Sequence, residues 1–223
     1  MVDVIDVDSA FKSAEYWENR YKSRGTSGAG SFGRLASFKA QFLNAFVRAN
    51  SVQSVIEFGT GNGVQTRLYD FPMYIGIDVS ETAIAASRAL FAGSDKHQFF
   101  LAPEVVQAHE CDVSASVDVI YHLIEDAVFD KYMRDLFFFG TKYVVIYSSD
   151  DDAPWAATHV RHRKFSKFVE TRFPEWRHAA TVKNLYPFDM TDQTNTSFAD
   201  FFVFVRRGLS CTIPIPPDAG ELQ

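Results

Sequence analysis

Cysteine is scarce in this sequence: its 223 residues include only Cys111 and Cys211, far apart and without a CxxC or Cys/His pattern. Neither a disulfide framework nor a zinc site is therefore predicted, and a reducing, cytoplasmic location is expected. Long apolar runs are also missing, because none approaches the roughly 18 to 20 residues that span a bilayer. The first ten residues carry three acids and no base, so neither a secretory signal nor membrane insertion is expected.

An excess of basic residues is missing as well. Lys and Arg number 22 and Asp and Glu number 28, which gives a net charge of −6. An acidic surface repels polyanions, so a general nucleic-acid binder is disfavoured. No internal repeat is present. Hydrophobic residues make up 47% of the chain, which is enough for one buried core. We predict a single domain.

Helical and strand-like segments alternate along the chain. An amphipathic helix is predicted from Arg34, with Leu35, Phe38, Phe42, Phe46 and Val47 on its apolar face and Lys39, Gln41, Asn44 and Arg48 on its other faces. Strands are predicted at 51–58, 73–78, 97–101, 113–121 and 142–149, and helices after Gly63, over 80–92 and over 125–139. This alternation indicates an α/β fold with a mostly parallel sheet and helices on both faces.

The pattern changes beyond Asp152. One helix is predicted over 154–173, and the strand-like runs 177–187 and 197–207 should pair antiparallel because no helix separates them. The chain is accordingly divided into an amino-terminal lid segment with a glycine-rich loop (1–33), a domain (34–207) and a flexible tail (208–223).

The most informative motif is EFGTGNG at 57–63, between a buried strand and a helix. Its three glycines permit a sharp turn and let a ligand lie against main-chain amides at a helix amino terminus. The spacing is GxGxG with Val64 in the sixth place, whereas a dinucleotide turn has glycine or alanine there. The turn therefore favours a ligand other than a dinucleotide.

An acidic residue ends the next strand. Asp78 follows Glu57 by twenty-one residues, at the position from which a carboxylate accepts hydrogen bonds from a ribose diol. With the glycine turn it predicts a nucleoside pocket. The alternative is that Asp78 and Ser80 only cap the following helix.

Two stretches, VIEFGTGNG (55–63) and YIGIDVS (74–80), resemble the first two motifs of class I S-adenosylmethionine-dependent methyltransferases. The resemblance extends over about 34–207 and implies S-adenosylmethionine as cofactor and a Rossmann-like, seven-stranded sheet whose last strand is antiparallel. It implies cofactor contacts at Glu57, Gly59, Thr60, Gly61 and Asn62, at Asp78 for the ribose and at Val79 for the adenine. The contact with the adenine amino group stays open between Ala102 and Glu104. More narrowly, YWENRY, GAGSFGRLASFK, VDVIYHLIED and HVRHRKF resemble small methyltransferases of sugars or related metabolites in glycan or natural-product pathways.

The end of the fourth predicted strand should face the transferred methyl group. His122 and Asp118 are the candidates there, with Tyr121 as a substrate contact. Histidine suits the removal of an acceptor proton because its ordinary pKa is about 6.5. The alternative for His122 is a packed core histidine.

A second group of candidates lies in a basic stretch, 159–178, which holds six Arg or Lys and two Glu. On the predicted helix His159, His162 and Arg163 share a face. His162 is the third catalytic candidate, and His159 and Arg163 would bind a phosphate or carboxylate of the acceptor. Arg161, Lys164 and Lys167 are instead expected to form a solvated helix face. Asp118, His122 and His159 could in principle ligate a divalent metal, but mixtures of carboxylate and imidazole are common in proteins, so no metal site is predicted.

The predicted lid supplies further cofactor contacts. Tyr16 and Arg20, with Trp17 and Tyr21 beside them, could fold over a bound sulfonium and its carboxylate. The alternative is an ordinary helix anchored on the core.

Together with these candidate residues, the resemblance implies an enzyme that methylates an oxygen, in preference to a nitrogen, of a small polar and anionic acceptor such as a sugar or sugar phosphate. Two alternatives stay open: a nicotinamide-dependent oxidoreductase or epimerase, and a noncatalytic nucleotide- or nucleic-acid-binding module.

Overall fold

The computed structural model describes residues 11–215, without the side chains of 105–107. The parts of the predicted lid and tail at 1–10 and 216–223 lie outside the described residues. The helices are α1 (Ser13–Lys22), α2 (Gly33–Ala49), α3 (Glu81–Leu90), α4 (Asp126–Phe139) and α5 (Phe165–Arg172). The strands are β1 (Val55–Phe58), β2 (Tyr74–Asp78), β3 (His97–Leu101), β4 (Cys111–Val117), β5 (Gly140–Ser148), β6 (Trp176–Val182) and β7 (Asp200–Arg206). Short 3-10 turns lie at Ala29–Ser31, Gln65–Leu68, Ala102–Gln107 and Ile120–His122.

These strands form a seven-stranded sheet in the order β3-β2-β1-β4-β5-β7-β6. The pairs from β3 to β5 are parallel, and β7 runs antiparallel to both β5 and β6. Every residue of β1 and β2 is buried, because helices cover both faces of the sheet. The predicted Rossmann-like fold with an antiparallel last strand is confirmed.

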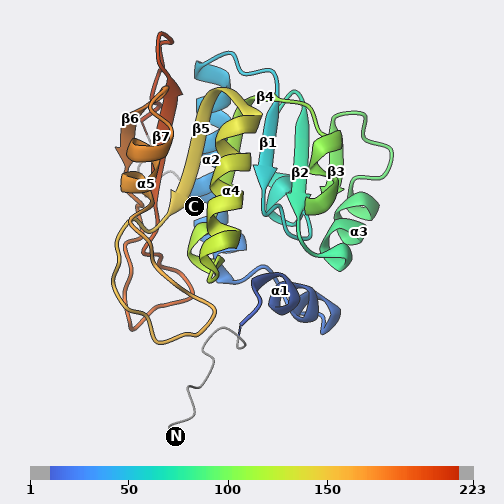
Figure 1. Cartoon of the computed structure of the whole chain (residues 1–223). Coiled ribbons are helices and arrows are strands. Elements are labelled where there is room, and N and C mark those ends of the chain that lie inside the picture. The colour runs from blue at the N-terminus through green and yellow to red at the C-terminus, as the bar shows by residue number, and fades with distance from the viewer. Residues whose placement is uncertain (1–10, 216–223) are drawn as a thin grey trace, which may run out of the picture.

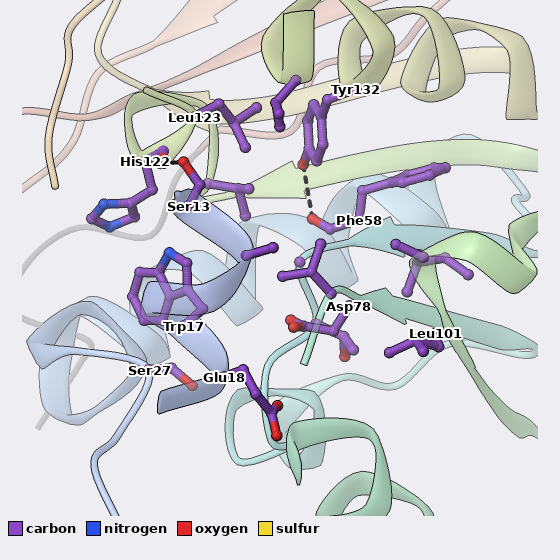
Figure 2. Close-up of a pocket in the computed structure, with 18 of the residues that line it drawn as sticks. Ser13, Trp17, Glu18, Ser27, Phe58, Asp78, Leu101, His122, Leu123 and Tyr132 are labelled. Carbon is purple, nitrogen blue, oxygen red and sulfur yellow. Dashed lines mark hydrogen bonds between the residues drawn. The ribbon is translucent and has the colours of Figure 1, made fainter. Parts of the chain in front are cut away.

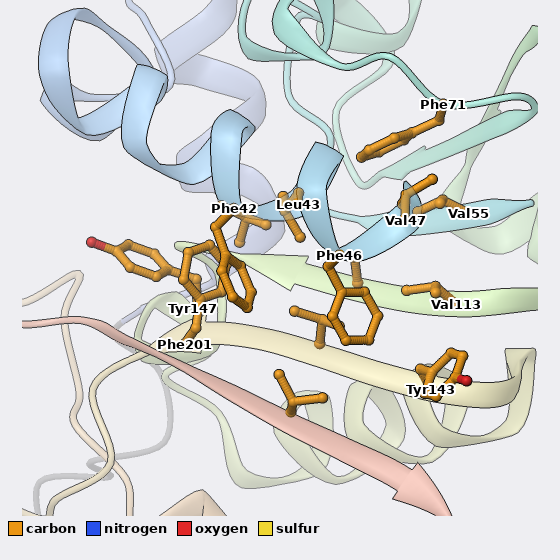
Figure 3. Packing of buried hydrophobic residues seen from close by; sticks show 14 of the residues in the cluster. Phe42, Leu43, Phe46, Val47, Val55, Phe71, Val113, Tyr143, Tyr147 and Phe201 are labelled. Carbon is orange, nitrogen blue, oxygen red and sulfur yellow. The ribbon is translucent and has the colours of Figure 1, made fainter. Parts of the chain in front are cut away.

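The two faces carry separate apolar clusters, with α2 and α3 on one side and α4 and α5 on the other (Figure 1). On the α2 side, the ring of Phe42 lies 4.3 Å from that of Phe201, and Phe46 meets Tyr143 edge to face (Figure 3). Each buried aromatic side chain of this kind stabilises the fold by roughly 1.5–3 kcal/mol. This packing fixes α2 against the sheet, and with it any polar side chain that α2 directs toward the strand ends.

The predicted helix over 154–173 is wrong in its first half, because α5 begins only at Phe165. The Asp152 carboxylate accepts the amide N–H of Lys164 at 2.9 Å, and the amide of Arg161 donates to a main-chain carbonyl of the turn after β4 at 2.7 Å. Backbone groups that would make helical bonds thus find partners elsewhere. Residues 153–164 form an irregular loop instead.

The helix predicted from Arg34 is confirmed as α2, and its five apolar positions are buried. The prediction for Lys39 is wrong, because this side chain is only 1% exposed and lies on the buried side of α2.

Past β7, Ser210 and Thr212 are tied to the domain: the Ser210 carbonyl accepts from the Tyr143 hydroxyl at 3.0 Å, and Thr212 exchanges two hydrogen bonds with Asn50. The division into lid, domain and tail stays a prediction. Among the described residues, no helix combines the length and the apolar character needed to cross a membrane.

Candidate active site

A cavity of about 1160 Å³ lies at the carboxyl ends of the parallel strands. The ends of β1, β2, β3 and β4 form one wall, and α1 and α4 form the others. Figure 2 shows Ser13, Trp17 and Glu18 of α1 on one side and Asp78 and Leu101 at strand ends on the other. Ligands of open α/β sheets bind at this edge.

The glycine turn after β1 has the backbone that the sequence predicts. Gly59, Gly61 and Gly63 have φ values of 84°, 63° and 77°, in the left-handed region that favours glycine. A Cβ at Gly59 would lie 2.3 Å from Cγ2 of Val119, and one at Gly61 would lie 2.7 Å from the Ser27 hydroxyl. Glycine is therefore favoured by the positive φ at both positions and, at Gly59, also by the close approach of Val119.

Asp78 ends β2 and faces this turn. One of its carboxylate oxygens accepts the amide N–H of Gly61 at 2.8 Å, and the other accepts that of Ser80 at 2.9 Å. Each oxygen retains a lone pair for a ligand. Burial raises the pKa of Asp78. The helix cap itself comes from Ser80, whose hydroxyl accepts the amide of Ala83 at 3.0 Å, so capping of α3 does not depend on Asp78.

Glu57 lines the cavity wall at the end of β1 but is engaged by two phenols. The Tyr74 hydroxyl donates to it at 2.5 Å and the Tyr69 hydroxyl at 3.4 Å. Burial raises its pKa to about 7. Glu57 is therefore partly protonated at neutral pH, which makes it a weak partner for a ligand cation.

Asp118 follows β4 and is held by two donors. The Lys39 ammonium pairs with one oxygen and the Tyr121 hydroxyl donates to the other at 2.8 Å. The ammonium also lies 5.4 Å from the ring centroid of Tyr147, a favourable cation–π distance. Asp118 lines the cavity, and Lys39 lies behind it.

Lys39 is a functional candidate that sequence reasoning missed. It lies four residues after Leu35 and four before Leu43, which are both buried. A helix places residues four apart on one face, so this spacing signals that Lys39 faces inward.

His122 lies at the edge of the cavity, with its ring edge-on to Trp17 at 4.9 Å (Figure 2). Its Nδ1 is 2.8 Å from the carbonyl oxygen of His159. Burial lowers the pKa of His122 to about 4, so the ring is neutral at pH 7. Because a carbonyl only accepts, Nδ1 carries the proton and Nε2 keeps a free lone pair.

Hydrogen bonds at both ends anchor α1 over the cavity. The Ser13 hydroxyl donates to the His122 carbonyl at 2.9 Å, and the Ser13 amide donates to Glu125 at 2.9 Å. Near the other end Glu18 accepts from the hydroxyls of Ser80 at 2.6 Å and Thr82 at 2.8 Å. The Ser80 hydrogen bond is the main reason that the pKa of Glu18 falls to about 2.

Several other predicted site residues do not line the cavity: Tyr16, Arg20, Gly61, Asn62, Tyr121, His159, His162 and Arg163. Tyr16 stacks on His159 at 5.1 Å, and Arg20 donates to the Thr26 carbonyl at 2.6 Å. By contrast Glu57, Gly59, Thr60, Asp78, Val79, Asp118 and His122 all line it. The roles of both groups stay predictions.

The expected helical grouping of His159, His162 and Arg163 is wrong, since they lie in the loop before α5. Arg163 is bound to Asp126 at 2.6 Å and to two main-chain carbonyls. His162 is buried and hydrogen-bonded to Ser149 at 2.6 Å. Both side chains therefore have structural partners already.

The cavity is acidic. The described residues that line it include eight carboxylates and three lysines, and Lys12, Lys22 and Lys131 each pair with a lining carboxylate. The inner wall suits a cation. Within residues 11–215, no three His, Cys, Asp or Glu side chains gather as metal ligands would.

No family model and no curated protein matches the sequence. Solved structures of several methyltransferases share its fold. The N-methyltransferase NodS from Bradyrhizobium japonicum WM9, in complex with S-adenosyl-L-homocysteine, matches with a TM-score of 0.66 and 14% identity, over 88% of this chain and 100% of that one.

Two further structures match similarly. Magnesium protoporphyrin IX methyltransferase (ChlM) from Synechocystis PCC 6803, with bound SAM, has a TM-score of 0.61 and 14% identity, over 89% of this chain and 99% of that one. A putative O-methyltransferase from Klebsiella pneumoniae has a TM-score of 0.54 and 14% identity, over 90% of this chain and 91% of that one. Structural neighbours therefore include both N- and O-methyltransferases.

Proposed function

We propose that this chain is an S-adenosylmethionine-dependent methyltransferase. The observation that carries the proposal is the pairing of Asp78 with the glycine turn: the Gly61 amide fixes the carboxylate at 2.8 Å, and both Asp78 and Gly59 line one cavity. This arrangement offers acceptor oxygens to a ribose diol beside a turn without side chains.

The residues present fit the cofactor in shape and charge. Val79, Leu101 and Ala102 lie along the cavity beyond Asp78 and would contact the adenine. Ala102 is the better candidate for the adenine amino group, because Glu104 accepts the Leu101 amide at 3.3 Å and does not line the cavity. The acidic wall would favour a sulfonium cation.

His122 is the proposed base. When bound, the cofactor supplies an electrophilic methyl group, and alignment of the reactants provides most of the acceleration. The free Nε2 of His122 can take the proton that an acceptor hydroxyl loses. Its low pKa keeps the ring neutral at pH 7, so the Nε2 lone pair is unprotonated throughout the physiological range. The same low pKa makes the ring a weaker base than an ordinary histidine, which leaves alignment of the reactants as the larger contribution.

We propose oxygen as the methylated atom, on a small polar acceptor such as a sugar. The expectation of an anionic acceptor depended on Arg163, which is bound to Asp126 and to main-chain carbonyls. An uncharged hydroxyl compound fits the acidic cavity better. A cytoplasmic location stays a prediction.

Isothermal titration with S-adenosylmethionine, S-adenosylhomocysteine and NADH tests this function. Wild type should bind the two sulfur compounds and not NADH. Asp78→Asn should weaken both by roughly tenfold or more, because a charged hydrogen-bond acceptor is lost, while Glu104→Gln, a matched carboxylate outside the cavity, should change neither. Binding of NADH without heat from the sulfur compounds would favour the oxidoreductase alternative.

A further inference from the structure

An ion pair with a buried cation lies at the cavity edge, where α2 meets the end of β4. Its cation, Lys39, is 1% exposed, whereas Asp118 reaches the cavity. Burying the Lys39 ammonium costs several kcal/mol of desolvation, which is only partly repaid by its attraction to Asp118. Hydrophobic residues would fill the same space at less cost, so the pair calls for a reason beyond folding.

The orientation of Asp118 is fixed from three directions. Lys39 holds one oxygen, Tyr121 holds the other at 2.8 Å, and the Asp118 amide donates to the Tyr147 carbonyl at 2.9 Å. Its φ of 58° is uncommon for a residue with a side chain. The carboxylate is thus held in one position with lone pairs left over for a ligand.

The order of the strand ends indicates which part of a bound nucleoside would lie beside Asp118. β2, which ends in Asp78, neighbours β1, and β1 neighbours β4, which leads into Asp118. Adjacent strands lie about 4.8 Å apart, so Asp78 and Asp118 are separated by roughly 10 Å across the turn of Gly59. A nucleoside whose ribose lies on Asp78 would place an amino-acid chain attached at its 5′ position close to Asp118.

The carboxylate at the end of β1 is less suited to that ammonium group. Glu57 already accepts two phenolic hydrogen bonds, and it is partly protonated at neutral pH because of its burial. Asp118 is paired with the Lys39 ammonium and lies one strand further from Asp78 than Glu57 does.

Resting on the proposed function, we infer that Lys39 is a positioning residue that holds Asp118 as the anchor for the ammonium group of the cofactor's methionine end. Lys39 itself does not reach the ligand. Its positive charge stabilises the carboxylate, and its hydrogen bond sets the direction in which the carboxylate points.

The test compares two ligands that differ in the methionine end. S-adenosylhomocysteine carries the amino acid, and 5′-methylthioadenosine has the same adenine, ribose and sulfur without it. Wild type should bind S-adenosylhomocysteine the more tightly. Asp118→Asn and Lys39→Met should each weaken S-adenosylhomocysteine by roughly 10- to 100-fold, the value of a charge-assisted hydrogen bond, and leave methylthioadenosine unchanged.

A second variant covers the case in which Lys39→Met does not fold. A Cβ at Gly30 would lie 2.8 Å from the Asp118 oxygen that faces Lys39 and 3.4 Å from the ammonium. Gly30 does not have a positive φ, so Gly30→Ala keeps the backbone and displaces only the carboxylate. It should lower affinity for S-adenosylhomocysteine alone.

The outcomes separate the two proposals. If wild type binds neither ligand, the proposed function fails. If wild type binds both equally, or if the Asp118, Lys39 or Gly30 variants leave the ratio of the two affinities unchanged, the function stands and the inference is overturned. Equal weakening of both ligands in Lys39→Met would show a merely structural lysine and would also overturn it. Asp78→Asn is the positive control, because it should weaken both ligands.

Discussion

Gly59→Ala should destabilise the protein through its backbone conformation and through a steric clash with Val119. The alanine would have to adopt the φ of 84° that Gly59 has, and its Cβ would lie 2.3 Å from Cγ2 of Val119. The left-handed backbone costs an L-residue about 1–2 kcal/mol, which is offset in part by about 0.4–1 kcal/mol from a less flexible unfolded chain. Overpacking adds about 1–3 kcal/mol. We expect a total loss of about 2–4 kcal/mol.

Gly93→Ala is the matched control, because Gly93 has a φ of 83° and no atom within 4 Å of its Cβ position. It should lose about 1 kcal/mol from the backbone alone. Urea unfolding followed by circular dichroism measures both. Val119→Ala should rescue part of the loss in Gly59→Ala, since the clashing methyl groups are removed. If Gly59→Ala is as stable as Gly93→Ala, the steric argument is refuted.

Three further predictions concern charged or titrating groups. Glu57 has a pKa raised from 4.5 to about 7, so the folded state keeps a proton that the unfolded chain releases. The free energy of unfolding should therefore fall by roughly 3 kcal/mol as the pH rises from 4.5 to 7. Glu57→Gln should remove this pH dependence in urea unfolding at a series of pH values, and an unchanged dependence would contradict the assignment. Glu18→Gln should weaken the docking of α1 by about 1–2 kcal/mol, read as roughly tenfold faster amide exchange in α1 with no change in α4. His122→Ala should lower turnover far more than cofactor affinity, and near-normal turnover would remove His122 from the role of base.

The parts of the fold that sequence reasoning predicted well are set by local chemistry. The positive φ of Gly59 and Gly61, the cap at Ser80 and the full burial of β1 each follow from a residue type and its immediate neighbours. The position of Asp78 at a strand end follows in the same way, because a buried strand and a helix cap bracket it. These features suffice to predict the sheet and half of the cavity wall.

The parts that were missed depend on residues far apart in the chain. Lys39 and Asp118 are 79 residues apart, and Ser13 and Glu125 are 112 apart. The loop before α5 replaces a predicted helix because its polar groups bind the turn after β4, 37 to 40 residues away. The hydrophobic periodicity of a segment cannot predict such a distant partner, because it shows which face of the segment is buried and not which residues pack against that face.

The same distinction explains why the electrostatics of the site could not be predicted. Counting charges along 159–178 suggests an anion site, but a cation binds a ligand only if the fold has not already supplied its partner. Arg163 has Asp126, and the lysines on the cavity wall have carboxylates. Lys39 has Asp118, and this pair keeps a carboxylate on the cavity side. Pairing in three dimensions therefore neutralises Arg163 with Asp126 and places the Lys39 ammonium of α2 behind the Asp118 carboxylate, which faces the cavity. A fixed negative charge at this place is what the proposed sulfonium cofactor, with its ammonium group, would need.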